Sequence, residues 1–147
     1  MSSPRLSADT IHATSVAMDN RAVLITGASG AGKSDLALRL IDRGFTLVSD
    51  DQTLVRRDGD HLVASAPPSI KGKLEIRGIG IVEIESGSDV PVALLVELIS
   101  DLERLPDESR ERPLLDIKIP LVSIDAMTAS AVAKVVLALD RFGLRMK

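Results

Sequence analysis

The stretch of the sequence with the clearest chemistry is Gly27-Ala28-Ser29-Gly30-Ala31-Gly32-Lys33-Ser34. It matches the pattern G-x-x-x-x-G-K-[ST] in full. Glycines let the backbone curl so that successive N–H groups point at phosphate oxygens, and a helix that starts there adds its positive dipole end. Lys33 can reach the outer phosphates of a nucleotide, and the Ser34 hydroxyl can bind Mg²⁺. We therefore expect the stretch to bind a nucleoside triphosphate or a polyphosphate.

Two adjacent carboxylates, Asp50 and Asp51, close the strand predicted after this loop and its helix. Neighbouring strand residues point to opposite faces, so the two groups are expected to do different work. One can meet a metal ion or its water, and the other can take a proton from an acceptor hydroxyl. On spacing alone, an aspartate pair that starts a turn is an equally good interpretation.

Four further side chains are candidates for the same site. Glu75 and Arg77 are two residues apart in a strand-like segment, where they could offer a metal ligand and a phosphate clamp. A surface ion pair is the simpler interpretation of that spacing. His12 lies in an early strand, where a histidine is more often structural. Arg104 lies in the charged segment 102–112, predicted to be an exposed loop, from which an arginine could contact a transferring phosphate.

The elements that must position these residues follow from the apolar pattern. Ala22 to Thr26 is a short apolar run that leads into the glycines, which is typical of a strand buried on both faces. Residues 35–43 have helical spacing, and Gly44 suits a left-handed helix end. The other predicted elements are a strand at 10–18 with a turn at Asp19-Asn20, strands at 45–49, 52–57, 61–65, 73–84, 90–99 and 113–124, and a helix from Ala131 that stops at Gly143. This order predicts an α/β fold with a mixed sheet.

Composition excludes several classes of function. The 147 residues suit one domain, and the net charge of −3 argues against a nucleic-acid partner. There is no cysteine, which excludes disulfides, thiolate catalysis and zinc–thiolate sites. The longest apolar run, residues 90–99, is interrupted by Glu97 and is too short to span a membrane. A cytoplasmic protein without a membrane partner is the expectation.

Four segments in this order closely resemble the catalytic domain of HPr kinase/phosphorylase: IHATSVAM, VLITGASGAGKSDLALRLIDRGF, LVSDD and LEIRGIGIVEI. This bacterial enzyme phosphorylates a serine of HPr, a carrier protein of the sugar phosphotransferase system, and reverses the reaction by phosphorolysis. The similarity covers roughly residues 10–142. It implies a P-loop α/β domain resembling phosphoenolpyruvate carboxykinase. The chain is similar to short members that consist of the catalytic domain only, so residues 1–147 are expected to form a single kinase domain.

The resemblance implies a role for individual residues. Asp51 corresponds to the aspartate that deprotonates the acceptor serine and, in reverse, protonates the leaving oxygen. Lys33 corresponds to the loop lysine, and Ser34 to the Mg²⁺-binding serine. Glu75 corresponds to a second Mg²⁺ ligand. We expect Asp50 or a water molecule to complete the oxygen shell of the metal ion.

Three more residues gain a role in the same way. His12 corresponds to a histidine assigned to the active site, and Arg77 falls in the segment assigned to both directions of catalysis. Arg104 corresponds to an active-site arginine between two later strands. The implied cofactors are ATP and Mg²⁺, with pyrophosphate or phosphate as further possible reactants. The implied partners are an HPr-like carrier protein and further copies of the chain, since the family forms hexamers.

Two alternative functions stay open. The first is a small-molecule kinase of the nucleoside or shikimate type, which would share only the phosphate loop. Such chains usually have alternating βαβ units, and the strand-rich middle of this chain speaks against that order. The second is a nucleotide-binding regulatory module without transfer activity. A module of that kind needs neither Asp51 nor Glu75.

Overall fold

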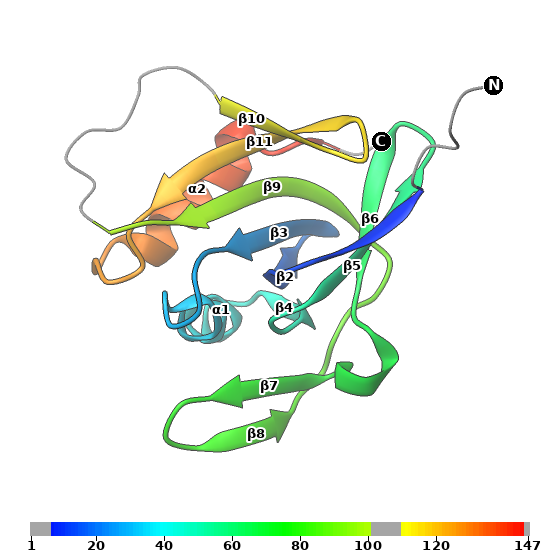
Figure 1. Ribbon diagram of the computed structural model, residues 1–147. Coiled ribbons are helices and arrows are strands. Elements are labelled where there is room, and N and C mark those ends of the chain that lie inside the picture. The colour runs from blue at the N-terminus through cyan, green and yellow to red at the C-terminus, as the bar shows by residue number, and fades with distance from the viewer. Residues whose placement is uncertain (1–6, 101–109, 146–147) are drawn as a thin grey trace.

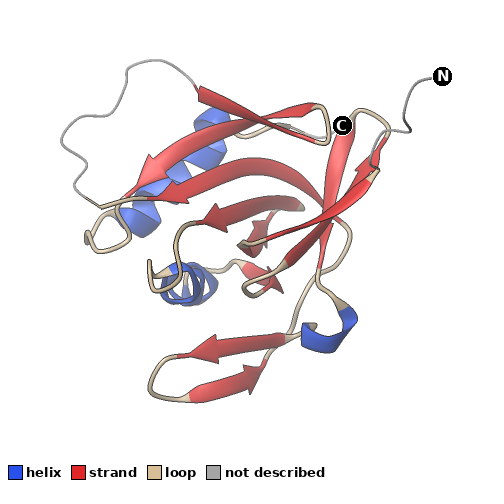
Figure 2. Ribbon diagram, viewed as in Figure 1, coloured by secondary structure: helices blue, strands red, loops and turns tan. Residues whose placement is uncertain are grey.

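A computed structural model describes residues 7–100 and 110–145 of the chain. Its strands are β1 (Ala8–Ile11), β2 (Thr14–Met18), β3 (Arg21–Thr26), β4 (Thr46–Ser49), β5 (Thr53–Asp58), β6 (His61–Ser65), β7 (Lys73–Ile76), β8 (Gly80–Glu83), β9 (Val90–Leu98), β10 (Arg110–Leu114) and β11 (Ile117–Ile124). Its helices are α1 (Lys33–Asp42), α2 (Ala131–Phe142) and the short 3₁₀ helix η1 (Pro68–Ile70). Within the described residues, a 9-stranded mixed sheet forms the body, and β7 and β8 form a separate hairpin (Figure 1, Figure 2). The predicted α/β class with a mixed sheet is confirmed.

The directions of the strands determine where the loops meet. β3 pairs in parallel with β9, and β9 pairs in parallel with β11, so their arrows point the same way in Figure 1. β2 is antiparallel to both β3 and β4, so β4 also runs in the direction of β3. The carboxyl ends of β3, β4, β9 and β11 and the first residue of β2 therefore lie at one edge of the sheet.

Local sequence explains the first βα unit. Asp19 and Asn20 both have positive φ, 53° and 58°, which is the backbone of a tight hairpin turn between β2 and β3. Apolar side chains fill α1 on the side that faces the sheet, and Gly44 follows the helix with φ 115°. A left-handed residue at this place ends a helix and is easiest for glycine. The predicted strand, helix and helix end are confirmed.

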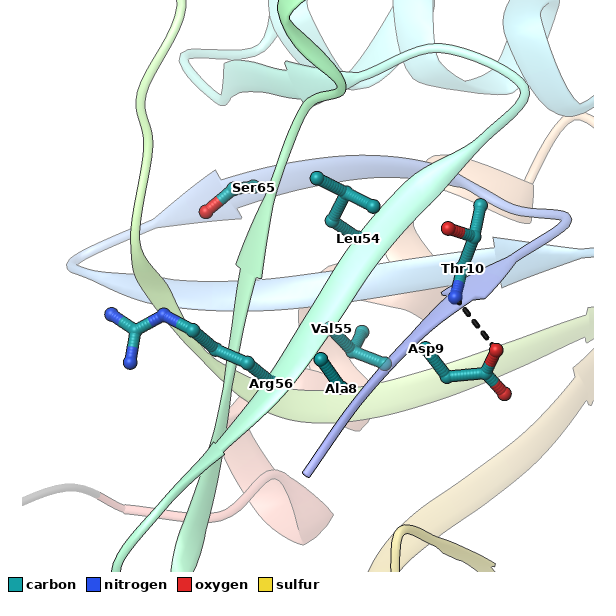
Figure 3. Close-up of a pocket in the computed structure, with 7 residues that line it drawn as sticks. All are labelled: Ala8, Asp9, Thr10, Leu54, Val55, Arg56 and Ser65. Atoms are coloured by element: carbon teal, nitrogen blue, oxygen red, sulfur yellow. Dashed lines mark hydrogen bonds between the residues drawn. The ribbon is translucent and has the colours of Figure 1, made fainter. Parts of the chain in front are cut away.

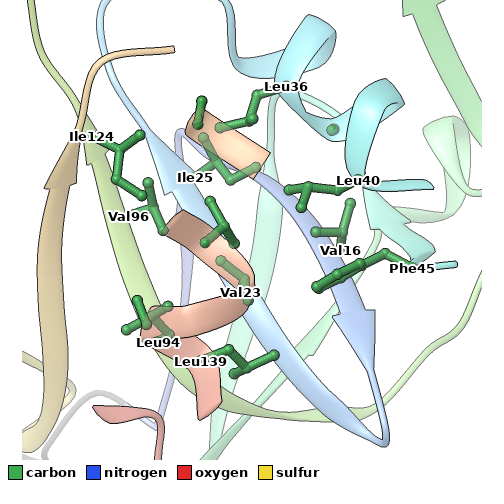
Figure 4. Packing of buried hydrophobic residues seen from close by; sticks show 14 of the residues in the cluster. Val16, Val23, Ile25, Leu36, Leu40, Phe45, Leu94, Val96, Ile124 and Leu139 are labelled. Atoms are coloured by element: carbon green, nitrogen blue, oxygen red, sulfur yellow. The ribbon is translucent and has the colours of Figure 1, made fainter. Parts of the chain in front are cut away.

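Two apolar cores lie on opposite faces of the central strands. One core fills the space between β3, β9 and the two long helices, where Val23, Ile25 and Leu36 are fully buried (Figure 4). The other core contains Leu24 and Leu95 and is closed by side chains of β5, β6 and β11. Alternate residues of β3 thus enter different cores, as expected for a strand buried on both faces.

Four sequence-based expectations are wrong in detail. The strand predicted at 10–18 is two strands, since the chain leaves β1 after Ile11 and enters β2 at Thr14. The segment 73–84 is a hairpin whose turn contains Arg77, so Arg77 does not share a strand face with Glu75. Glycines at the tip, with positive φ at Gly78, explain the turn.

The third correction concerns residues 110–112, which were predicted as exposed loop and lie in β10. The guanidinium groups of Arg112 and Arg110 lie 2.8 Å and 3.5 Å from carboxylate oxygens of Glu97 on β9. Ser123 on β11 also donates to Glu97, over 3.3 Å. Glu97 thus offsets the charges that indicated a loop, and residues 110–114 pair antiparallel with β11. The fourth correction concerns the strand predicted at 113–124, which is interrupted because Leu115 and Asp116 have positive φ, 48° and 65°, and form the turn between β10 and β11.

Arg21 offers a test of how the second helix is held on the sheet. Its guanidinium donates to the carbonyls of Leu139 and Leu144, at 2.8 Å and 3.0 Å, where α2 ends. Burial, and then the charge of Arg145, lower the pKa of Arg21 from its usual range. Arg21→Met keeps the aliphatic stem and removes both hydrogen bonds, although the Leu139 carbonyl still accepts the N–H of Gly143 over 3.1 Å. The substitution should therefore lower the free energy of unfolding by about 1–3 kcal/mol. Urea titration measures this difference.

The control for that prediction is Lys134→Met on the exposed side of α2. This change should alter the unfolding free energy by less than about 0.5 kcal/mol. Equal effects of the two substitutions would contradict a role of Arg21 in holding α2.

Candidate active site

The glycine-rich loop, residues Gly27–Ser34, connects the carboxyl end of β3 to α1. Gly30 and Gly32 have φ of 82° and 100°, values that side-chain-bearing residues rarely adopt. Lys33 is buried, and its Nζ donates to the carbonyls of Gly27 and Ala28, at 2.9 Å and 3.1 Å. No side chain caps the start of α1. The loop thus combines an ammonium group with a helix N-terminus whose N–H groups are not covered by a side-chain cap.

Asp50 is the buried carboxylate of the pair, with 8% of its surface exposed. Its Oδ1 accepts hydrogen bonds from the hydroxyls of Ser34 (2.6 Å) and Thr14 (3.2 Å). Its Oδ2 accepts a hydrogen bond from the backbone N–H of Glu75 (3.0 Å). One carboxylate therefore connects the start of α1, the start of β2 and the β7–β8 hairpin.

Asp51 lies in a tight turn just after β4. The N–H of Gln52 donates to the carbonyl of Asp50 over 2.7 Å, and Asp51 between them has φ 67°. A turn closed across one residue with positive φ is rare and strained. The Asp51 side chain is 64% exposed, and its Oδ1 lies 2.8 Å from Nε2 of His12, itself 55% exposed. This carboxylate is open to solvent beside an imidazole, unlike its buried neighbour.

A cavity of about 290 Å³ adjoins both aspartates. It is lined by Asp50, Asp51, Gln52, Ile70, Lys73, Glu75 and Ile81. The lining thus comes from the β4–β5 connection on one side and from the β7–β8 hairpin on the other. The cavity brings Glu75 to the same place as the aspartate pair.

The family described as "HPr Serine kinase C-terminal domain" matches residues 5–141. The chain belongs to this family. It is 34% identical over 139 residues to the HPr kinase/phosphorylase of Chlorobium limicola, which covers 85% of this chain and 42% of that protein. It is 36% identical over 139 residues to the HPr kinase/phosphorylase of Geobacillus thermodenitrificans, and this match covers 86% of this chain and 45% of that protein. The chain thus spans less than half the length of these curated relatives.

A solved structure shares the fold of this family domain. The HPr(Ser) kinase/phosphatase from Coxiella burnetii superposes with a TM-score of 0.79 and 29% sequence identity, over 90% of this chain and 88% of that chain. The resemblance found in the sequence is therefore confirmed at the level of the family and the fold. Neither α1 nor α2 has the length and apolar character needed to span a bilayer, and they are the only long helices in the described ranges.

The structure brings most of the predicted site residues of this family member together. Ser34 contacts Asp50, His12 contacts Asp51, and Glu75 lines the cavity beside both aspartates. Arg77 is exposed in the turn of the β7–β8 hairpin. Arg104 lies outside the described residues.

One residue at this site was missed by sequence reasoning. Thr14 is fully buried, and its hydroxyl contacts both the Asp50 carboxylate and the Asp51 backbone. The sequence feature that could have indicated Thr14 is its hydroxyl, two residues after His12 and at the start of a strand. The pairing of β2 with β4, which gives that hydroxyl its partners, cannot be read from local sequence.

The side chains at this site fit the Mg²⁺ ion that the family implies. A serine hydroxyl and an aspartate carboxylate lie 2.6 Å apart beside the glycine-rich loop, and Mg²⁺ prefers such oxygen donors. Within the described residues there is no group of three or more His, Cys, Asp or Glu side chains that could hold a metal ion alone. Mg²⁺ in phosphoryl-transfer sites usually takes one or two carboxylates and completes its shell with water and substrate phosphates, so this donor set is sufficient.

A larger cavity, of about 460 Å³, lies on β1, β5 and β6 (Figure 3). None of the predicted site residues lines it. Figure 3 shows the Asp9 carboxylate turned back to the N–H of Thr10, a bond of 2.8 Å, and Arg56 at the far side. Ser65, which also lines it, donates to Asp89 over 2.9 Å and lowers the pKa of that carboxyl. Arg56 also contacts Asp89, over 3.5 Å, so the Asp9, Arg56 and Ser65 side chains that line this cavity have partners within the protein. The cavity is separate from the aspartate pair.

Proposed function

We propose that this domain is an ATP- and Mg²⁺-dependent protein kinase that phosphorylates a serine of HPr or of an HPr-like carrier protein. Membership of an enzyme family of this type supports the proposal. The observation that carries it is the pairing of two carboxylates in different surroundings. Buried Asp50 contacts the glycine-rich loop through Ser34, and exposed Asp51 follows it directly.

On the donor side, the glycine-rich loop serves as a phosphate-binding P-loop. Its backbone N–H groups and Lys33 bind the β and γ phosphates of ATP. Ser34 and Asp50, with Glu75 in the adjoining cavity, would hold Mg²⁺. When bound, Mg²⁺ would neutralise charge that develops on the phosphate oxygens. The protein groups on this side therefore orient the donor and stabilise negative charge.

On the acceptor side, Asp51 serves as the general base. A serine oxygen forms a bond to the γ phosphorus while the bond from that phosphorus to the bridging oxygen of ATP breaks. The serine proton passes to the Asp51 carboxylate, and ADP leaves. His12, 2.8 Å from Asp51, orients the carboxylate toward the acceptor. Arg77 and Arg104 are proposed to offset charge on the transferred group.

The exposure of the base favours a protein acceptor over a metabolite. Asp51 and His12 stand on the surface with more than half of each side chain exposed. A serine on a folded protein can approach such a base only if the base projects from the surface. Enzymes that act on small molecules usually enclose most of the substrate in a pocket.

We extend the proposal from the resemblance to the setting of the enzyme. The domain is proposed to act in the cytoplasm as a homo-oligomer, with the hexamer of the family as the expected form. Phosphorolysis, which uses phosphate and yields pyrophosphate, is the proposed reverse activity. The segment Ser123–Thr128 lacks the basic residues that longer members place there for dephosphorylation, so we expect the kinase direction to dominate.

A transfer assay tests the proposal. The purified protein is incubated with γ-labelled ATP, Mg²⁺ and a panel of HPr-like carriers, each paired with a variant whose acceptor serine is alanine. We expect label on the serine-containing carrier only. Label on a metabolite would favour a small-molecule kinase. ATP binding without transfer to any member of the panel would favour a regulatory module.

A further inference from the structure

The Thr14 hydroxyl is the link between the two aspartates. Thr14 is the first residue of β2 and is fully buried. Its Oγ1 donates to Oδ1 of Asp50 over 3.2 Å and accepts the backbone N–H of Asp51 over 3.1 Å. A hydroxyl has one hydrogen to donate and lone pairs to accept, so both bonds can exist together. One atom thus connects the buried carboxylate with the backbone that carries the exposed one.

The backbone at Asp51 needs such a support. The turn at Asp51 has positive φ, and strained backbone of this kind persists only where surrounding contacts hold it. Two hydroxyls bind the turn from outside. Ser49 donates to the carbonyl of Gln52, and Thr14 accepts the N–H of Asp51 itself. Of these two hydroxyls, that of Thr14 also donates to the Asp50 carboxylate, whereas that of Ser49 donates to the Gln52 carbonyl.

We propose that Thr14 is a positioning residue, which holds the Asp50 carboxylate beside Ser34 and at the same time fixes the turn that presents Asp51 to the acceptor. Thr14 is not itself a metal ligand and does not touch substrate. Its effect on catalysis rests on the proposed function. Its effect on the geometry of the turn does not, and can be measured in the protein without nucleotide.

Two substitutions at Thr14 separate the hydroxyl from the methyl group. Thr14→Val keeps the branched shape and removes both hydrogen bonds, whereas Thr14→Ser keeps the hydroxyl and removes a buried methyl. Thr53→Val is the matched control. Thr53 is also fully buried, and its hydroxyl contacts Ser15 and the carbonyl of Ala13 but neither aspartate. A purely structural hydroxyl would make Thr14→Val and Thr53→Val behave alike.

The first readout is hydrogen exchange at the Asp51 amide, measured by NMR without nucleotide. Relative to the global stability of each variant, this amide should exchange about tenfold faster in Thr14→Val. It should stay protected in Thr14→Ser and in Thr53→Val. This measurement decides the geometric part of the proposal whether or not the protein transfers phosphate.

The second readout is steady-state kinetics with ATP and a carrier protein that accepts phosphate. Loss of a residue that orients a metal ligand typically lowers activity by roughly 10–100-fold. Since Thr14 orients both Asp50 and the backbone of Asp51, we expect kcat of Thr14→Val to fall by that factor. The KM for ATP should change by less than about threefold, because the lost bonds act on orientation rather than on donor binding. Thr14→Ser should recover most of kcat, although its missing methyl leaves a cavity.

The outcomes separate this inference from the proposed function. Wild-type protein that transfers no phosphate would refute the proposed function, and the amide exchange would still decide the role of Thr14 in the turn. An Asp51 amide that is equally protected in Thr14→Val and in the wild type would overturn the inference. So would a kcat of Thr14→Ser as low as that of Thr14→Val. If Thr14→Val does not fold, loss of Asp51 protection in Thr14→Ser overturns it as well.

Discussion

Replacing Asp51 by asparagine should lower the rate of phosphoryl transfer by about 10²–10⁴-fold, the usual contribution of a general base. ATP binding should stay within about twofold of the wild type, because Asp51 lies in the β4–β5 turn and is hydrogen-bonded to His12 and Thr14 rather than to the glycine-rich loop. Asparagine is the right replacement here. It keeps the size of the side chain and tolerates the positive φ of 67° at this position, which alanine would strain.

The measurement compares single-turnover transfer rates with ATP affinities from calorimetry for the same preparations. Asp42→Asn, at the exposed end of α1, is the matched control, since it makes the same chemical change away from the site. If Asp51→Asn transfers phosphate as fast as Asp42→Asn, Asp51 is not the general base of the reaction. Loss of ATP binding in Asp51→Asn would show that the residue acts on the donor instead.

Replacing Lys33 by methionine should weaken ATP binding by about 10–100-fold, the cost of losing a charge-assisted hydrogen bond in a buried setting. Lys33 is buried, with 7% of its surface exposed, and its Nζ donates to two carbonyls of the loop. The ammonium group is therefore already at the loop before a phosphate binds, and no lysine side chain has to move in from solvent. Methionine keeps the stem and removes only the charge.

Calorimetric titration with ATP measures that loss, and circular dichroism shows whether the fold survives. Lys134→Met, on the exposed side of α2, controls for the removal of one positive charge. Unchanged ATP affinity in a folded Lys33→Met protein would contradict phosphate binding by the glycine-rich loop. Because Asp51→Asn is expected to spare ATP binding and Lys33→Met is expected to weaken it, the pair separates the donor side from the acceptor side.

The parts of the fold that sequence predicted are those specified by short stretches. The run from Ala22 to Thr26, the glycines after it and the helical spacing that follows were enough to predict β3, the loop and α1, and Gly44 marked the helix end. The strand break after Ile11 was missed because residues on both sides of it are β-branched. The turn at Arg77 was missed because its flanking residues continue the strand pattern.

The parts that could not be predicted depend on pairing between distant segments. Residues 110–114 are a strand because they pair antiparallel with β11, and the charges of Arg110 and Arg112, which suggested a loop, are matched by Glu97 on β9. The surroundings of the aspartate pair depend on β2, which has Thr14 and His12 near its start and lies beside the end of β4. The structure puts Asp50 rather than Glu75 in direct contact with Ser34. The likeness to phosphoenolpyruvate carboxykinase, and the roles of Arg77 and Arg104, stay predictions.

The proposed serine kinase activity is tested most directly by locating the phosphate on the acceptor. The protein is incubated with ATP, Mg²⁺ and a purified HPr-like carrier, with Asp51→Asn in parallel, and the carrier is sequenced by mass spectrometry. The proposed function predicts one phosphoserine on the carrier with the wild type, and almost none with Asp51→Asn although that variant still binds ATP. An unmodified carrier with ATP-saturated wild-type protein, or equal phosphoserine with both proteins, would contradict it.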